Sequence, residues 1–352
     1  DPRNLAPTRL DPAICAQLRA SILLAGPLLA RFGQVTLPPP GGDVIGRRRV
    51  DTHFLALERL GAEVTIGAEY RVEARTLTGA DIFLDEPSVT ATENTLMAAS
   101  RARGTTILRN AASEPHVQDL ARALVAMGAS IDGIGTNLIT IRGVDRLQGT
   151  TLEVGPDHIE VGSFIGLAAV TNGQIVIDGV RPDDLRGTLL QFERLGIRPR
   201  LDGTKLIVES SQERRVRPDL GGHIPKIEDG PWPAFPADLM SIATVVATQC
   251  EGQILIFEKM FESRLFFVDK LIGMGARIVL CDPHRVVIAG PSELRGSVVA
   301  SPDIRAGMAM LLAALAAEGE SVIHNIEQID RGYERIDQRL KSLGAKIERV
   351  TE

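Results

Sequence analysis

The chain is poor in aromatic residues and cysteines and has no apolar run long enough to cross a membrane. Aromatic residues make up 4% of the 352 residues, and three cysteines (Cys15, Cys250 and Cys281) stand apart without metal-ligand spacing. Such cysteines argue against a disulfide framework and favour a reducing compartment. The longest apolar stretch, 306–317, is well short of the roughly 18 residues that a membrane span needs. The opening residues lack the apolar core of a signal peptide, so we expect a cytoplasmic protein without a membrane partner.

The motifs of common cofactor and metal sites are also missing. The sequence contains no Walker A sequence, G-x-G-x-x-G fingerprint, H-E-x-x-H or G-x-S-x-G, and its six histidines are not paired. We therefore predict no cofactor and no metal. With 39 Lys and Arg against 45 Asp and Glu, the net charge is −6. A nucleic-acid partner, which needs a broad basic face, is therefore not expected. An anionic ligand would be held by a few placed arginines.

What the sequence does contain is a repeat. A phrase of Leu or Met followed by Gly recurs at intervals of 67 to 79 residues, at Gly61, Gly128, Gly196, Gly275 and Gly344. A second phrase, an apolar run followed by Gly and β-branched residues, precedes each copy by 23 to 28 residues, at Gly33, Gly104, Gly173, Gly252 and Gly319. Chance is the alternative explanation because Leu-Gly-Ala is common, but two phrases that recur five times in the same order favour a true repeat.

Each copy is interpreted as helix, Gly stop, strand, loop, second helix, Gly stop and strand. A glycine just past the last helical turn takes the left-handed conformation that ends a helix. The segments AEVTI, ASIDGI, ARIVL and AKIERV that follow these glycines carry the β-branched residues of strands. The sequence therefore predicts an α/β fold in which every unit has its own piece of sheet. Because five is an odd number for two domains, we expect a sixth unit of about 70 residues that is absent at the N-terminus.

The length of the chain exceeds what a single core fills, so two domains are expected. We place the first domain, with two repeats and the lid described below, at 1–155, and the second, with three repeats, at 156–352. The widest repeat interval contains a Pro- and Gly-rich insertion at 211–236. Long loops inside compact domains are usually functional.

The first candidate motif is PPPGGDVIGRRRVDTH, residues 38–53. Three prolines followed by two glycines give a stiff arm and a pliable hinge, which suits a lid over a ligand. Arg47, Arg48 and Arg49 can present forked donors to phosphate or carboxylate. The alternative is a solvated basic turn.

The second candidate motif is PWPAFPADLM, residues 231–240, with Asp238 where the chain re-enters a helix. Asp238 is either a helix N-cap or a general base beside a bound sugar hydroxyl. Four single arginines, each more often a surface salt-bridge partner, stand near element ends in different repeats: Arg19, Arg264, Arg305 and Arg331.

At these residues the chain resembles the family of UDP-N-acetylglucosamine 1-carboxyvinyltransferases. The similarity runs from about Asn4 to the C-terminus and is carried by LRASILLAGPLLARFG, GGDVIGRRRVDTH, PSVTATENTLMAA, PAFPADLM, FESR and IDRGYERID. The resemblance implies the enolpyruvyl-transferase fold, an α/β (α+β) fold with two domains. Each domain has three βαβαββ-like units around a pseudo-threefold axis, with the active site in the cleft between the domains. Five of the six units are expected here.

The resemblance also implies a reaction: transfer of the enolpyruvyl group of phosphoenolpyruvate to the 3-hydroxyl of UDP-N-acetylglucosamine, the first committed step of peptidoglycan synthesis. Asp238 would take the hydroxyl proton, and Asp43 would be the acid that protonates the substrate carbon. Two carboxyl groups in opposite roles must differ in proton affinity. Arg305 and Arg331 would gather the carboxylate and phosphate of phosphoenolpyruvate.

The remaining family positions would bind the nucleotide sugar. Arg19 would contact its phosphates, Ser88 and Val89 would border the uridine, and Met260 would contact the sugar through its backbone. Arg264, in the FESR segment, is a further binding residue. Arg48 would hold the nucleotide and help to clamp phosphoenolpyruvate, together with Arg49, Val50, Asp51, Thr52 and His53.

The chain departs from the family pattern at several positions. Asp43 replaces a usual cysteine, whose thiol fosfomycin alkylates, so we predict insensitivity to that drug. Thr90 stands where the family often has Gly, and Glu86 where some members have Lys. The Lys-Asn pair of the N-terminal unit is not supplied, so we expect the chain alone to be inactive. The alternatives are the related transferase that acts on shikimate 3-phosphate and a non-catalytic sugar-nucleotide-binding paralogue or fragment.

Overall fold

The computed structural model describes residues 10–350, which divide into two compact units. Unit 1 comprises residues 10–43 and 48–155, and unit 2 comprises residues 44–47 and 156–350. The four residues Val44–Arg47 of the predicted lid thus belong by their contacts to unit 2.

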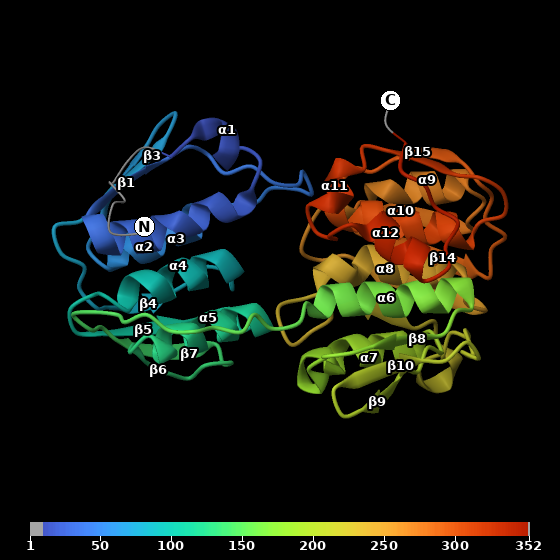
Figure 1. The fold of residues 1–352 in the computed structure, drawn as a ribbon, viewed down its shortest axis with the longest axis horizontal. Coiled ribbons are helices and arrows are strands. Elements are labelled where there is room, and N and C mark those ends of the chain that lie inside the picture. The colour runs from blue at the N-terminus through green and yellow to red at the C-terminus, as the bar shows by residue number, and fades with distance from the viewer. Residues whose placement is uncertain (1–9, 351–352) are drawn as a thin grey trace. The chain divides into compact units, whose positions relative to one another are not determined.

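Unit 1 contains two sheets with helices packed against them (Figure 1). The first sheet has the antiparallel order β1-β3-β2, and the second has the order β4-β5-β7-β6, in which only β4 and β5 are parallel. The elements of the first part are α1 (Pro12–Cys15), η2 (Arg19–Leu24), α2 (Ala25–Phe32), β1 (Gln34–Leu37), α3 (Asp51–Arg59), β2 (Glu63–Ile66) and β3 (Tyr70–Glu73). Those of the second are β4 (Asp81–Phe83), α4 (Val89–Ala99), β5 (Thr105–Arg109), α5 (Pro115–Ala126), β6 (Ser130–Asp132) and β7 (Leu138–Arg142).

Unit 2 contains three sheets. Their orders are β8-β10-β9, β11-β12-β14-β13 and β15-β16, with β11 parallel to β12 and β15 parallel to β16. The first part consists of α6 (His158–Thr171), β8 (Ile175–Ile177), η3 (Pro182–Leu185), α7 (Arg186–Arg194), β9 (Arg200–Asp202) and β10 (Lys205–Val208). The second consists of η4 (Leu220–Gly222), β11 (Lys226–Glu228), η5 (Ala237–Leu239), α8 (Met240–Thr248), β12 (Gly252–Phe257), η6 (Arg264–Phe267), α9 (Val268–Gly273), β13 (Ile278–Asp282) and β14 (Arg285–Gly290). The third consists of β15 (Val298–Ala300), α10 (Ile304–Ala316), β16 (Val322–His324), α11 (Glu327–Asp330) and α12 (Ile336–Ser342).

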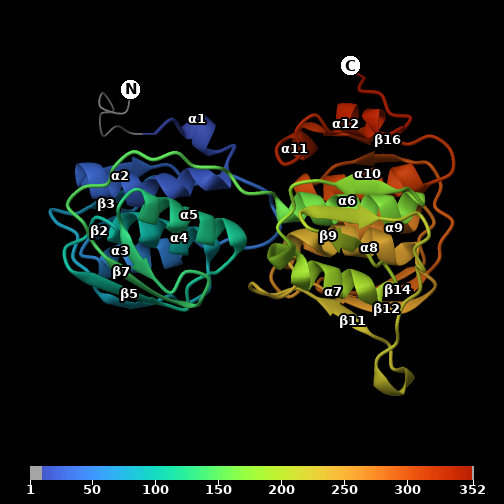
Figure 2. The same cartoon turned by 60° about the horizontal axis from the view of Figure 1, so that its bottom comes forward.

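The predicted enolpyruvyl-transferase fold is confirmed by this element order. The segments β4-α4-β5-α5-β6-β7 and β11-α8-β12-α9-β13-β14 are each a complete βαβαββ unit. The five sheets of the described residues correspond one to one with the five sequence repeats. The insertion at 211–236 supplies β11, and Figure 2 shows the chain around η4 projecting from unit 2 as a loop.

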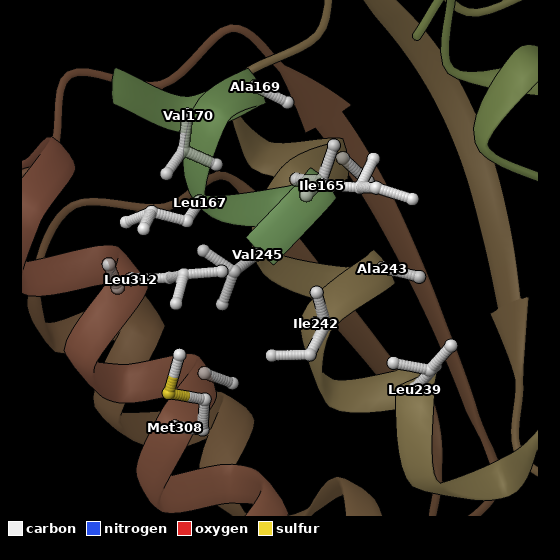
Figure 3. Packing of buried hydrophobic residues seen from close by; sticks show 14 of the residues in the cluster. Ile165, Leu167, Ala169, Val170, Leu239, Ile242, Ala243, Val245, Met308 and Leu312 are labelled. Carbon is white, nitrogen blue, oxygen red and sulfur yellow. The ribbon is translucent and has the colours of Figure 1, made fainter. Parts of the chain in front are cut away.

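The core of unit 2 is a group of three apolar helices, α6, α8 and α10. All nine residues of α8 are buried, as expected of a helix that is apolar on every side. Figure 3 shows Ile165 of α6, Val245 of α8 and Leu312 of α10 in this core. Gly166 permits the close approach, because a Cβ there would lie 2.5 Å from Cγ2 of Ile242. Burying each large side chain stabilises the unit by about 1.5–3 kcal/mol.

The repeated glycines act as predicted, with one exception. Nine of the ten have positive φ, and at the tenth position Asn172, just before Gly173, takes the left-handed conformation with φ 53° at the end of α6. Asparagine tolerates this conformation because its short side chain forms local hydrogen bonds. The strands predicted at AEVTI, ASIDGI and ARIVL are present as β2, β6 and β13.

The strand predicted at AKIERV is wrong. Residues 345–350 form no strand in the described chain. Ala345 and Ile347 pack against the core of unit 2, but β16 pairs with β15 alone among the described strands. A strand requires a partner edge as well as β-branched residues, and the sequence pattern reports only the latter. Over residues 10–350, no helix has both the length and the apolarity to cross a bilayer.

Candidate active site

The first group of predicted site residues lies in unit 1, where the start of η2 meets the chain that leads into α3. Nη2 of Arg19 donates to the backbone carbonyls of Arg48 and Arg49 at 3.0 and 2.7 Å. A Cβ on Gly42 would lie 2.9 Å from the Cβ of Arg19 and 3.2 Å from Nη1 of Arg48, so both arginines crowd this glycine. Burial and the nearby Arg48 charge lower the pKa of Arg19. Two guanidinium groups so close together present several donors that phosphate or carboxylate oxygens can accept.

Arg49 differs from its neighbours because carboxylates already hold it. Its guanidinium donates to Asp51 at 3.0 Å and to Asp85 at 2.7 Å, and Thr52 donates to the other oxygen of Asp85 at 2.7 Å. The Thr52 hydrogen bond and the Arg49 ion pair lower the pKa of Asp85 against the effect of its burial. Arg49 therefore holds the start of α3, which begins at Asp51 just after the half-buried Val50. Its role as a substrate contact stays a prediction.

His53 is the centre of a buried hydrogen-bond chain whose polarity is fixed. The amide of Asn94 accepts from the N–H of Gly26 at 2.7 Å and donates to the carbonyl of Ile22 at 2.9 Å, which defines its orientation. Nδ2 of Asn94 then donates to Nδ1 of His53 at 2.8 Å, so the ring proton lies on Nε2. Nε2 donates to Oγ1 of Thr90 at 3.0 Å. Burial, reinforced by Arg19, lowers the pKa of His53 to about 3, so the ring is neutral at pH 7.

This chain leaves the hydroxyl of Thr90 as a directed donor. Its oxygen already accepts from His53, and within the described residues its hydrogen has no acceptor. Ser88 and Val89 precede it at the start of α4, where Oγ of Ser88 caps the helix by accepting from Ala91 N at 3.3 Å. The sequence analysis identified Ser88, Val89 and His53 but missed Asn94, although TENTL lies inside a quoted motif. A polar side chain in an apolar helix was the signal.

The lid residues divide between the two units. Asp43 is half-buried in unit 1. Ile45 is buried in unit 2, where its carbonyl accepts from the N–H of Ser263 at 3.1 Å. The N–H of Arg47 donates to Glu262 at 3.3 Å, and a Cβ on Gly46 would lie 2.0 Å from that carboxylate. Gly46 has φ +131°, a backbone conformation that residues with a side chain rarely adopt, so a substitution here would be strained.

The second group of predicted residues lies in unit 2, around the carboxylate of Asp238. Nη2 of Arg264 donates to Oδ1 of Asp238 at 2.8 Å, and Nε and Nη2 of Arg305 both lie 3.0 Å from Oδ2. The side chains of Arg264 and Arg305 are 3% and 17% exposed, whereas Asp238 is 39% exposed. The partly exposed carboxylate therefore has a guanidinium on each oxygen, with Arg264 buried and Arg305 half-buried. The N-cap alternative is wrong, because Asp238 lies within η5 and the cap residue of that turn is Pro236.

Arg305 is held from behind by Tyr333 and Ser163. Nη1 of Arg305 donates to the Tyr333 hydroxyl at 3.3 Å, and that hydroxyl lies 2.7 Å from Oγ of Ser163 on α6. Burial lowers the pKa of Arg305, but the charge of Asp238 together with the effects of Tyr333 and Asp157 outweighs it, and the net change is upward. Arg331 lies two residues before Tyr333, is exposed, and donates to Gln328 at 2.7 Å. Its direct part in a site stays a prediction.

Arg264 also faces a second carboxyl, Glu258. Its Nε lies 3.7 Å from Oε2 of Glu258, and its guanidinium lies 5.2 Å from the ring of Phe261. The carboxyl groups of Glu258 and Asp229 both accept a hydrogen bond from the N–H of Met260. The carbonyl of Met260 is therefore the backbone group of this residue that remains for a ligand. The sequence analysis identified Met260 and missed both acids.

The family described as EPSP synthase (3-phosphoshikimate 1-carboxyvinyltransferase) matches residues 4–340. The UDP-N-acetylglucosamine 1-carboxyvinyltransferase of Bradyrhizobium diazoefficiens is 66% identical over 350 residues, which cover 99% of this chain and 81% of the relative. The enzyme of that name from Treponema denticola is 62% identical over 341 residues, 97% of this chain and 80% of the relative.

Solved structures agree on the fold. The enolpyruvyl transferase NikO from Streptomyces tendae matches with a TM-score of 0.84 at 23% identity, covering 97% of this chain and 80% of its own. EPSP synthase from Acinetobacter baumannii matches with a TM-score of 0.70 at 18% identity, covering 94% and 78%. Identity at this level shows the fold alone, whereas the curated relatives match at far higher identity over almost the whole chain. The chain therefore belongs to the UDP-N-acetylglucosamine 1-carboxyvinyltransferase family.

Proposed function

We propose that this chain transfers the enolpyruvyl group of phosphoenolpyruvate to the 3-hydroxyl of UDP-N-acetylglucosamine, the first committed step of peptidoglycan synthesis, in the cytoplasm. The observation that carries the proposal is the Asp238 carboxylate, partly exposed and held between the guanidinium groups of Arg264 and Arg305. It combines a base with cationic groups in one place, as this reaction requires.

The reaction proceeds by addition and elimination. The sugar oxygen forms a bond to C2 of phosphoenolpyruvate, its proton goes to Asp238, and C3 gains a proton from an acid. In the second step the bond between C2 and the phosphate oxygen breaks, and a proton leaves C3 to restore the double bond. The products are the enolpyruvyl ether and inorganic phosphate. These steps balance with the two substrates and the two proton-transferring groups, without a change of oxidation state.

The ion pairs of Asp238 make it a weak base until substrate binds. Two guanidinium groups at 2.8–3.0 Å stabilise its charged form. Phosphoenolpyruvate carries a carboxylate and a phosphate that compete for the same donors, and each unit charge about 4 Å away is worth about 4 kcal/mol at an effective dielectric constant of about 20. Binding of phosphoenolpyruvate to Arg305 and Arg331 would therefore free Asp238 to accept the hydroxyl proton.

The nucleotide sugar would use the groups of unit 1. The neighbouring guanidinium groups of Arg19 and Arg48 suit its diphosphate. The hydroxyl of Thr90, which accepts from His53 and has its hydrogen left to donate, suits a carbonyl oxygen of the uracil ring beside Ser88 and Val89. Asp43 takes the role of the acid toward C3, and Met260 offers its carbonyl to the sugar.

Phosphate release tests the proposal. The chain is incubated with phosphoenolpyruvate and either UDP-N-acetylglucosamine or shikimate 3-phosphate, and inorganic phosphate is measured over time. The missing Lys-Asn pair predicts an inactive chain, whereas the site around Asp238 favours release with the nucleotide sugar and none with shikimate 3-phosphate. Asp238→Asn is expected to lower that release by at least 100-fold. Release with shikimate 3-phosphate would assign the chain to the related transferase. Saturable binding of the nucleotide sugar without phosphate release would indicate a binding protein.

A further inference from the structure

Two buried acids that the proposed mechanism does not use lie side by side in unit 2. Asp229 directly follows β11 and Glu258 directly follows β12, and these parallel strands pair Glu228 with Phe257 at their ends. The two carboxyl groups therefore emerge from one edge of the sheet. Asp229 is 1% exposed and Glu258 is 0% exposed. Burying two unneutralised charges in this way is strongly unfavourable.

Both acids bind the same short turn. Asp229 accepts hydrogen bonds from the N–H groups of Lys259 and Met260, at 2.5 and 3.3 Å. Glu258 accepts from the N–H groups of Met260 and Phe261, at 3.2 and 3.1 Å. The N–H of Met260 is thus shared by one oxygen of each carboxyl group. Three consecutive backbone donors are therefore fixed by two acids, and the turn cannot rotate without losing several of these bonds.

Carboxyl groups so close together cannot both be ionised without a large repulsion. Burial, followed by the hydrogen bond and charge of Asp229, raises the pKa of Glu258 to about 9, although Arg264 opposes the change. At neutral pH Glu258 is therefore protonated, and the pair carries at most one negative charge. That proton removes the repulsion and keeps the acceptor oxygens in place.

We propose that Asp229 and Glu258 form a one-proton carboxyl pair that positions residues 259–261, presenting the carbonyl of Met260 to the sugar and leaving the charge of Arg264 to Asp238. Both acids are positioning residues, since neither is placed against a substrate. The sugar contact rests on the proposed function, whereas the shared proton and the fixed turn do not.

The surrounding charges have other partners. Lys226 and Lys259 pair with Glu228, at 2.7 and 3.3 Å. The ring of His284 bonds the backbone carbonyl of Glu258 at 2.7 Å and not its carboxyl group. Further out, Arg285 pairs with Asp282, and Glu262 accepts from the backbone of the lid segment. Among the described residues, the charged side chains that act on Glu258 are therefore Asp229 and Arg264.

The shared proton predicts a distinct dependence of stability on pH. The folded-state pKa of Glu258 lies above its usual value of 4.5, so its contribution to stability is complete below that value and is lost as the pH rises toward about 9. The variant Glu258→Gln keeps the neutral form, because its amide can donate to Asp229 and accept from the turn. It should abolish this loss of stability.

Two measurements on the full chain test the proposal. Thermal unfolding is followed from pH 6 to pH 9.5 for the unmodified chain, for Glu258→Gln and for the control Glu228→Gln on the same sheet edge. The melting temperatures of the unmodified chain and of the control should fall more steeply with pH than that of Glu258→Gln. Parallel curves for all three would overturn the shared proton.

The dissociation constant for UDP-N-acetylglucosamine is measured on the same proteins and on Glu258→Ala by calorimetry at pH 7. We expect Glu258→Gln and Glu228→Gln to stay within about twofold of the unmodified chain, and Glu258→Ala to bind at least tenfold more weakly. If Glu258→Gln and Glu258→Ala weakened binding of the nucleotide sugar equally, or if Glu258→Ala did not weaken it, the positioning role would be overturned. Failure of the unmodified chain to bind the nucleotide sugar would refute the proposed function instead, and the unfolding curves would still decide whether the pair holds one proton.

Discussion

Replacing Asp238 by Asn should both destabilise unit 2 and stop turnover. The substitution keeps the shape of the side chain but leaves Arg264 and Arg305 without their shared counter-charge. Removing one partner of a fully buried ion pair costs about 3–5 kcal/mol. Because the Asp238 side chain is 39% exposed, solvent screening reduces this figure, and we expect about 1–3 kcal/mol. Asp183→Asn, which breaks an ion pair whose partners are both 82% exposed, should change stability by less than about 0.5 kcal/mol.

The assay is chemical unfolding of the three proteins, with and without added phosphate. Two unneutralised guanidinium groups should bind an anion better than the neutralised pair, so phosphate should restore more stability to Asp238→Asn than to the unmodified chain. The loss of stability and the loss of turnover are measured separately. A variant as stable as the unmodified chain, or one that phosphate stabilises no further, would refute the electrostatic description of this site.

Three further outcomes are expected. Thr90→Val should weaken binding of the nucleotide sugar about fivefold, the value of one hydrogen bond of about 1 kcal/mol, and Thr90→Ser should restore it when both are measured by calorimetry. Mass spectrometry should find no fosfomycin adduct at Asp43, whereas Asp43→Cys should acquire one, since a thiolate is a far better nucleophile than a carboxylate; an adduct at Asp43 would contradict this. Leu312→Ala, in the centre of the unit 2 core, should lower the unfolding free energy by about 2–5 kcal/mol, and denaturation showing less than about 1 kcal/mol would contradict the packing described.

The repeats made most of the fold predictable from the sequence. A left-handed glycine after a helix is a local requirement, so the recurring phrases placed helix ends correctly. The exception, Asn172, is another residue that tolerates the same conformation. The segment AKIERV shows where this reasoning stops, because β-branched residues form a strand only when a neighbouring edge is available, and pairing is a property of the whole fold.

The site was predictable where a charged residue stood at an element end. Asp238, Arg264 and Arg305 were each identified from such positions, but their mutual contacts depend on packing between elements that the sequence does not reveal. The sequence analysis did not single out Tyr333, in IDRGYERI, or Glu258, two residues before Met260. Both lie close to identified residues, but in the sequence they look like ordinary polar positions. Their importance comes from burial, which became visible only in the structure.

The most direct test of the central claim is the mass of the nucleotide sugar after incubation with the chain and phosphoenolpyruvate in heavy water. We expect UDP-N-acetylglucosamine to become heavier by one enolpyruvyl group, with deuterium in the methylene of that group because C3 gains and loses a proton during the reaction. A nucleotide sugar of unchanged mass, while phosphoenolpyruvate remains intact, would contradict it.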